Sequence, residues 1–336
     1  MGITRTKIPV KTTMTWINWE KESRLVFDLK AGLEAALEEK ELELETSQWT
    51  GIPGFNDANI KVNKIVHRAI EQFDLPILST WYRYGQYEPH EEFTPSEVQP
   101  RTLDHHAFPA EASIPYRDFP SAKEFKGFFL ECDIESILEQ DLYEFLQENY
   151  TKTAPSEYKQ LYLANLQVFK LLDEMTEEEN LTEDTKYYRD QMGNYTSRIR
   201  RRLIANPTFD EETVEIVIQS LRAIKQALVA LSQTEDIQSD QIGYFETARE
   251  EYHESIWPLP AIQISIDKAS GVEADEFKNK GREMLRDIRD EASNKSDELT
   301  DDIYEMGLAP TEEDYRTIQD DLDESWKKVE NSAIRI

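Results

Sequence analysis

The sequence predicts a mainly α-helical protein, in which a small α+β winged-helix-like N-terminal module precedes an antiparallel helical bundle or array. Apolar residues recur at helical spacing over most of the 336 residues, which indicates amphipathic helices. Only 11 residues are glycine, and this low share disfavours a loop-rich or all-β chain. One short segment, TWYRYGQY (80–87), combines aromatic residues with a glycine in a pattern that does not suit a helix.

Two helices are expected near the N-terminus, over residues 19–46 and 56–73. Leucines recur at helical spacing in the first, and the breaker QWTGIPGF follows it. Asn56 or Asp57 can cap the second helix. The apolar face of this second helix comprises Ile60, Ile65, Val66, Ala69, Ile70 and Phe73.

The aromatic segment 80–87 is expected to form short strands or a turn, with Gly85 at the turn. Aromatic clusters usually belong to a core, because each ring removes a large apolar area from water. The expected contacts are those of Trp81 and Tyr84 with Ile65, Ala69 and Phe73. The residues expected to stay exposed, and so to be available to a partner, are Tyr82, Arg83 and Tyr87.

Six prolines between residues 88 and 120 block regular helix. We interpret this stretch as a long connection wrapped over the N-terminal unit, and as a domain boundary. The expected domains are residues 1–120, the winged-helix-like module with its proline-rich connection, and residues 121–336, a helical domain.

Helical periodicity continues almost throughout the second domain. Asp210 caps the clearest helix, at 211–232, and Ser156 is expected to cap another helix. The other segments expected to be helical are 134–150, 182–204, 237–256, 273–305 and the stretch that begins at Thr311.

Three segments of this domain do not follow the helical pattern. WPLP (257–260) is expected to break the chain, and AIQISI (261–266) alternates in the manner of a short strand. Residues 291–298 (EASNKSDE) are nearly all polar, which weakens the helix there or leaves it solvent-bridging.

The chain carries 68 acidic and 38 basic residues, a formal net charge of −30, and the acidic excess is spread along its length. A distributed excess is typical of solvated protein surfaces in a high-salt cytoplasm, where screening removes the self-repulsion. The composition therefore predicts a halophilic prokaryotic source and folding that strengthens from low to molar KCl.

Cys132 is the single cysteine, so no disulfide can form within the chain, in agreement with a reducing compartment. The first residues lack the apolar stretch of a signal peptide. No run approaches the roughly 20 apolar residues that a membrane span needs. We therefore expect a soluble, cytoplasmic protein.

No nucleotide-binding, hydrolase or multi-cysteine metal motif occurs in the sequence. Imidazole and carboxylate groups together can bind a transition metal, and the candidates are His90, Asp104, His105 and His106. Adjacent residues rarely bind one ion, and on a strand they face opposite sides, so a polar surface loop is favoured. No catalytic, metal or cofactor-binding residue is assigned, and no cofactor is expected.

The one basic island is SRIRRRL (197–203), which contains Arg198, Arg200, Arg201 and Arg202. On a helix these arginines spread around nearly the whole non-apolar arc. They are candidates for contact with nucleic-acid phosphates or with a partner protein. In a chain of this charge, pairing with neighbouring acidic helices, or closure of a subunit contact, is favoured over nucleic acid.

The sequence NKIVHRAIEQFD, followed by TWYRYGQYEPH, contains the pattern formed by Lys64, Ile65, Trp81, Tyr84 and Gly85. On these positions, residues 56–93 resemble the Panacea (SocA-like antitoxin) domain and related winged-helix-like modules of archaeal proteins. Gln86 and Tyr87 depart from the family pattern, in which proline and valine follow the Tyr-Gly pair. The resemblance implies a regulatory, protein-binding role and carries over no catalytic residue.

Together these patterns predict a non-enzymatic regulatory or protein-interaction protein, with an antitoxin-like role implied by the resemblance. A protein partner is expected, and the oligomeric state stays open. One alternative is a DNA-binding winged-helix regulator, which the negative charge and the salt sensitivity of phosphate binding disfavour. The others are a metal-dependent enzyme that uses the loop 90–106, and a structural protein of a virus or mobile element.

Overall fold

The chain is mainly helical in the computed structural model, which describes residues 23–42, 57–75, 77–82, 85–87, 120–176, 178–234, 238–271 and 274–316. The elements are α1 (Ser23–Glu39), α2 (Asp57–Gln72), β1 (Thr80–Tyr82), β2 (Gly85–Tyr87), α3 (Ala122–Glu131), α4 (Ile134–Glu139), α5 (Leu142–Thr153), α6 (Lys159–Met175), α7 (Glu178–Ala205), α8 (Glu211–Leu231), α9 (Ser239–Glu251), the π-helical turn η4 (Tyr252–Ile256), α10 (Pro258–Lys268) and α11 (Ala274–Glu305). The predicted mainly α class is confirmed.

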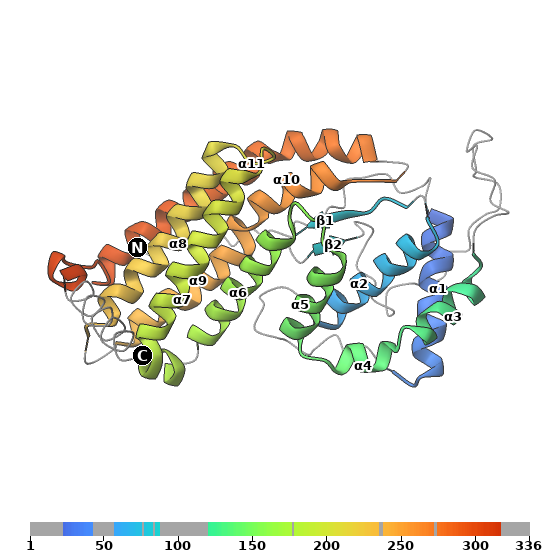
Figure 1. Cartoon of the computed structure of the whole chain (residues 1–336), viewed down its shortest axis with the longest axis horizontal. Coiled ribbons are helices and arrows are strands. Elements are labelled where there is room, and N and C mark those ends of the chain that lie inside the picture. The colour runs from blue at the N-terminus through green and yellow to red at the C-terminus, as the bar shows by residue number, and fades with distance from the viewer. Residues whose placement is uncertain are drawn as a thin grey trace, which may run out of the picture.

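Figure 1 shows two groups of elements along the long axis of the molecule, with α1 to α5 and the hairpin β1–β2 toward one end and α6 to α11 forming an elongated array at the other. One hydrophobic core joins α1, α2, α3 and the start of α4. The expected domain boundary at residue 120 falls just before α3, so this core draws residues from both sides of that position.

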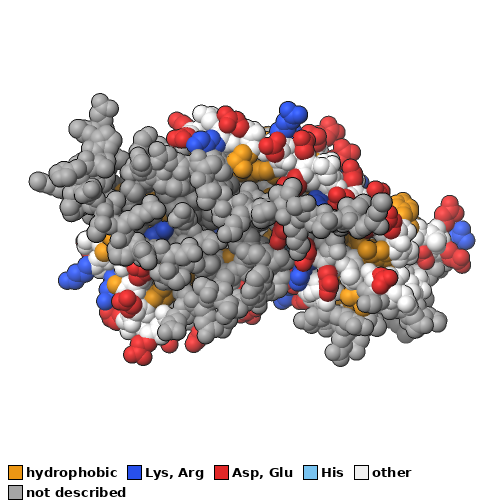
Figure 2. All heavy atoms as spheres, turned by 180° about the vertical axis from the view of Figure 1, so that it is seen from behind, with side chains coloured by type: hydrophobic (Ala, Val, Ile, Leu, Met, Phe, Trp, Pro, Cys, Tyr) orange, Lys and Arg blue, Asp and Glu red, His pale blue; other side chains and the backbone are white. Residues whose placement is uncertain are grey.

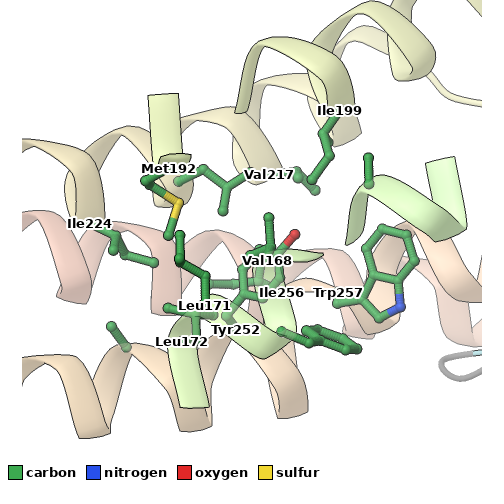
Figure 3. Packing of buried hydrophobic residues seen from close by; sticks show 14 of the residues in the cluster. Val168, Leu171, Leu172, Met192, Ile199, Val217, Ile224, Tyr252, Ile256 and Trp257 are labelled. Atoms are coloured by element: carbon green, nitrogen blue, oxygen red, sulfur yellow. The ribbon is translucent and has the colours of Figure 1, made fainter. Parts of the chain in front are cut away.

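A nearly continuous helix runs from α9 through η4 to α10 and forms the centre of the array. Every residue from Ser255 to Ser265 is buried. Figure 3 shows residues of α6, α7 and α8 gathered around η4. The residues it labels are Val168, Leu171, Leu172, Met192, Ile199, Val217, Ile224, Tyr252, Ile256 and Trp257, all of them buried.

The strand expected at 261–266 is wrong, because these residues belong to α10. A helix buried on every side has no polar face, so its sequence lacks the 3.6-residue alternation that marks a surface helix. The break expected at WPLP is also wrong. Pro258 stands at the first position of α10 and Pro260 in its first turn, where the backbone N–H groups have no partner within the helix.

The strongly periodic helices agree with the sequence. Those expected at 182–204, 211–232 and 273–305 are confirmed as α7, α8 and α11. Asp210 caps α8 as predicted, and its carboxylate accepts a hydrogen bond of 2.8 Å from the backbone N–H of Thr213.

Two helix starts differ from expectation. The helix expected over 134–150 is divided into α4 and α5, because Asp141 accepts a hydrogen bond of 3.0 Å from the Glu144 N–H and so begins a new helix. Helix α6 begins at Lys159 rather than after a cap at Ser156. Among the helices of the described ranges, none combines the length and the apolar character that crossing a membrane requires.

Candidate interaction surface

Strand β1 is fastened to the C-terminal end of α10 by a set of hydrogen bonds that we call the strand clasp. Thr80 Oγ1 donates to the carbonyl oxygen of Ser265 at 2.7 Å, and Ser265 Oγ donates to the carbonyl oxygen of Trp81 at 2.6 Å. Ser79 and Ser270 exchange two backbone hydrogen bonds, each 3.0 Å long. The clasp therefore joins the N-terminal group of elements to the helical array.

Trp81 is buried, as predicted, but its expected packing partners are wrong. Its ring centroid lies 5.4 Å from that of Tyr162 on α6, and it belongs to the core of the array. Ile65 and Ala69, the expected partners on α2, belong to the separate core that α2 forms with α1 and α3. The clasp explains the difference, because it holds the backbone of Trp81 against α10.

The partner-binding residues proposed in the aromatic segment are only partly described. The two strands pair antiparallel, with Thr80 opposite Tyr87 and Tyr82 opposite Gly85. Arg83, Tyr84 and the side chains of Tyr82 and Tyr87 lie outside the described residues, and their role stays a prediction. The candidate metal ligands His90, Asp104, His105 and His106 also lie outside them. In the part of the chain that is described, no three His, Cys, Asp or Glu side chains are placed to hold a metal ion.

The basic island lies on the outward side of α7. Tyr188, Met192, Ile199 and Leu203 form the buried stripe of this helix, and all four arginines point away from it into water. Tyr187 and Ile204, which are 51% and 60% exposed, flank them. We call this surface the α7 face, and it comprises Tyr187, Arg198, Arg200, Arg201, Arg202 and Ile204.

The arginines of the α7 face have no acidic partner among the described residues. Arg198 lies over the ring of Tyr195, 5.7 Å from its centroid. Arg201 Nε donates to the carbonyl oxygen of Ser197 at 3.2 Å. Neither contact neutralises a guanidinium charge, so the intramolecular pairing favoured from the sequence is not seen in the part of α7 and its neighbours that is described.

The basic field extends from α7 onto α8. Residues 191–209 and 216–234 contain no Asp or Glu, although the chain as a whole has 68. The second stretch carries Arg222 and Lys225, both exposed. A Cβ atom on Gly193 of α7 would lie 3.3 Å from Cε of Lys225, which places this lysine directly beside α7. Sequence reasoning missed these two cations, although the absence of acidic residues around them was a readable signal.

The helix dipole accounts for only part of this arrangement. The arginines lie in the last two turns of α7, where the helix dipole favours cations by roughly 0.3–1 kcal/mol each at an exposed site. One or two cations would satisfy that preference, whereas α7 presents four and α8 adds two more. Figure 2, seen from behind the view of Figure 1, shows acidic side chains spread over the described parts of that side, with fewer basic ones among them.

The fold and this surface define a mainly helical protein with a basic face on an otherwise acidic chain. The profile of one family, the Domain of unknown function (DUF8098), matches residues 14–127 and 111–335. These two stretches together cover nearly the whole chain, which therefore belongs to this family. No curated protein and no solved structure matches it.

Proposed function

We propose that this chain is a non-enzymatic interaction protein that binds a partner protein through the α7 face. One observation carries the proposal. Four exposed guanidinium groups have no carboxylate partner among the described residues, in a chain whose acidic residues outnumber its basic ones by 68 to 38. Guanidinium groups bind carboxylates bidentately, so the partner's matching surface is acidic.

The composition of the α7 face supports a protein partner over a nucleic acid. Protein interfaces are enriched in Arg and Tyr, and Tyr187 and Ile204 add exposed apolar area beside the arginines. The net charge of −30 repels the phosphates of a nucleic acid, and salt weakens phosphate binding steeply. A short-range interface of arginine and aromatic groups depends less on that long-range field.

The resemblance of residues 56–93 to the Panacea domain adds the finer part of the proposal. It supports a regulatory, antitoxin-like role, with a winged-helix-like module formed by α2 and the hairpin β1–β2. The distributed acidic surface supports a halophilic source and a cytoplasmic location. Under this proposal the interaction takes place at high salt, where contacts that exclude water keep their strength while exposed charge pairs are screened.

Charge reversal tests the proposal directly. We expect Arg200→Glu/Arg201→Glu to lose a partner that the unaltered chain retains in co-purification from its source cells, with an unchanged circular dichroism spectrum. The matched control is Arg282→Glu/Arg286→Glu on α11, which changes the net charge equally at two exposed arginines and is expected to keep the partner. Arg200→Lys/Arg201→Lys keeps the charge and loses the fork geometry, so weakened binding is expected.

Three outcomes would contradict the proposal. The first is that no protein co-purifies at any salt concentration. The second is that the partner binds the α7 double variant and the unaltered chain equally well. The third is a gel shift with DNA at the same salt that the α7 variant abolishes and the α11 variant retains, which would favour the nucleic-acid alternative.

A further inference from the structure

A second candidate site lies in the N-terminal group of elements and does not depend on the proposed function. It is a groove of about 550 Å³ between α2, α4 and α5. Its volume is within the range of small-molecule sites in proteins. The residues that line it are Arg68, Ser136, Ile137, Glu139, Gln140, Phe145, Glu148 and Lys152.

Arg68 is the fixed cation of this groove. Its Nη2 donates a long hydrogen bond of 3.4 Å to Oδ1 of the fully buried Asn149, and its guanidinium lies 5.8 Å from the centroid of the Phe145 ring. No described carboxylate lies within salt-bridge distance of it. An arginine carries five N–H donors in a planar fork. Most of those of Arg68 have no acceptor among the described residues and are open to water or a ligand in the groove.

The α4 side of the groove is held in place by a lysine. Lys61 Nζ donates to the carbonyl oxygens of Leu138, at 2.9 Å, and Gln140, which end α4. Helix C-terminal carbonyls otherwise lack partners and favour a cation. The side chain of Lys61 therefore secures α4 to α2, and with it the lining residues Ser136 and Glu139.

The charges of the groove are of both signs. Lys152 Nζ lies 3.0 Å from Oε2 of Glu148, and this hydrogen bond, together with the charges of Lys152 and Arg68, lowers the pKa of Glu148. Glu148 has Lys152 as its ion-pair partner, so Arg68 and the exposed Glu139 are the cation and the anion of the lining that form no ion pair with a described residue.

We propose that this groove binds a small zwitterion, with its carboxylate on Arg68 and its ammonium group on Glu139. The carboxylate matches the arginine fork, which binds such groups through two parallel hydrogen bonds. A simple anion is repelled by Glu139 and Glu148 and by the net charge of −30, whereas a zwitterion brings no net charge into that field. Free amino acids and short peptides belong to this class.

The test uses the full-length protein and titration calorimetry at constant ionic strength. The probes are glycine, β-alanine, γ-aminobutyrate and alanyl-alanine, which separate the two charges by increasing lengths, with acetate, phosphate and butylamine as single-charge probes. We expect at least one zwitterion to bind saturably and at least about tenfold more tightly than any single-charge probe, since a hydrogen-bonded charge contributes that much.

Variants assign the binding to the groove. Arg68→Gln is expected to weaken binding of the tightest-binding zwitterion by about tenfold or more. The control Arg286→Gln replaces an arginine on α11 whose side chain is 86% exposed, and it is expected to leave that affinity unchanged. Glu139→Gln is expected to remove the preference for the zwitterion over acetate. Glu139 is exposed, so this variant keeps the test decisive even where Arg68→Gln impairs folding.

Each of three results would overturn the proposal. They are the absence of saturable binding for every zwitterion, tighter binding of acetate or phosphate than of the zwitterions, and zwitterion binding that both Arg68→Gln and Glu139→Gln leave unchanged.

Discussion

Trp81→Ala is expected to lower the free energy of unfolding by about 3–5 kcal/mol, the usual cost of truncating a buried aromatic residue. The side chain is 6% exposed and lies against Tyr162, at a ring-centroid distance of 5.4 Å. Burying such a ring removes roughly 150–250 Å² from water, which at about 25 cal/mol per Å² corresponds to roughly 4–6 kcal/mol. The two estimates agree to within their precision.

Urea unfolding followed by circular dichroism measures this loss. The control is Tyr304→Ala, at a residue that is 71% exposed, for which a change within about 0.5 kcal/mol is expected. A loss below about 1 kcal/mol for Trp81→Ala would refute the packing described here.

Hydrogen exchange locates the effect of the same substitution. Because Trp81 belongs to the core of the array and not to the core that contains Ile65 and Ala69, protection is expected to fall in β1 and at the end of α10 around Ser265. Protection in α1 and α3 is expected to persist, since their core is separate. Loss of protection in α1 and α3 with none in α10 would contradict the assignment of Trp81 to the core of the array.

Three further predictions concern stability. Gly271→Ala should destabilise by about 1–3 kcal/mol in urea unfolding, because Gly271 has φ of +103° and a Cβ atom there would lie 2.5 Å from the Ile77 carbonyl oxygen. Its control, Gly243→Ala, has open space and should stabilise by up to about 1 kcal/mol; equal effects would refute the strain. Burial lowers the pKa of Lys64 to about 7. Between pH 7 and about 10.4, the usual pKa of lysine, this side chain binds more protons in the unfolded chain than in the folded one. The contribution of Lys64 to the free energy of unfolding therefore rises with pH over that window. Lys64→Met removes this titrating group, so the variant should exceed the unaltered chain in free energy of unfolding by an amount that shrinks as pH rises, by up to about 1.4 kcal/mol per pH unit. A difference that stays constant with pH would refute the lowered pKa. Free energy of unfolding should increase from low to molar KCl, and equal stability in both would count against the halophilic source.

The sequence predicts the surface helices well because their solvated faces carry polar residues and their buried faces carry apolar ones. Helices α7 and α8 each have one buried face and one solvated face, so apolar residues recur every three to four positions. Their caps are local as well, and Asp210 bonds a backbone group only three residues away. Information of this kind is contained in a short window of sequence.

Two features of the array are not predicted, each for its own physical reason: the helical conformation of 257–266 and the burial of part of α11. From Ser255 to Ser265 all sides are buried, so no polar face marks the helical period. In α11 the stretch 291–298 looks solvated, yet Ala292 and Ser296 are buried in it. Ser296 Oγ donates to the carbonyl oxygen of Ile216 at 3.3 Å, and a residue this small lets α8 approach closely without an apolar signal.

The two candidate sites differ in how far the sequence could reveal them. The arginines of the α7 face lie close together in sequence, between residues 198 and 202, and stand out by their charge. The groove brings Arg68 together with Asn149, 81 positions away, and the clasp joins Thr80 to Ser265 across 185 positions. Serine, threonine and asparagine are common on every protein surface. Only the fold therefore distinguishes Asn149, Thr80 and Ser265, which form these contacts, from residues of the same types that are exposed to water.

Both proposals depend on whether an arginine has a carboxylate beside it in this acidic chain. The chain has 68 acidic and 38 basic residues, and several of its basic side chains pair with carboxylates. Arg289 contacts Asp210 and Glu212, and Lys295 lies 2.9 Å from Glu251 and 2.8 Å from Glu298.

Arg68 and the arginines of the α7 face have no such neighbour among the described residues. An exposed ion pair contributes little, about 0–1 kcal/mol, so stability does not require these arginines to be paired. Stability also does not explain why residues 191–209, which hold the arginines of the α7 face, contain no acidic residue. A ligand or partner that supplies the missing carboxylate explains both. Replacement of these arginines should therefore alter binding far more than it alters the free energy of unfolding.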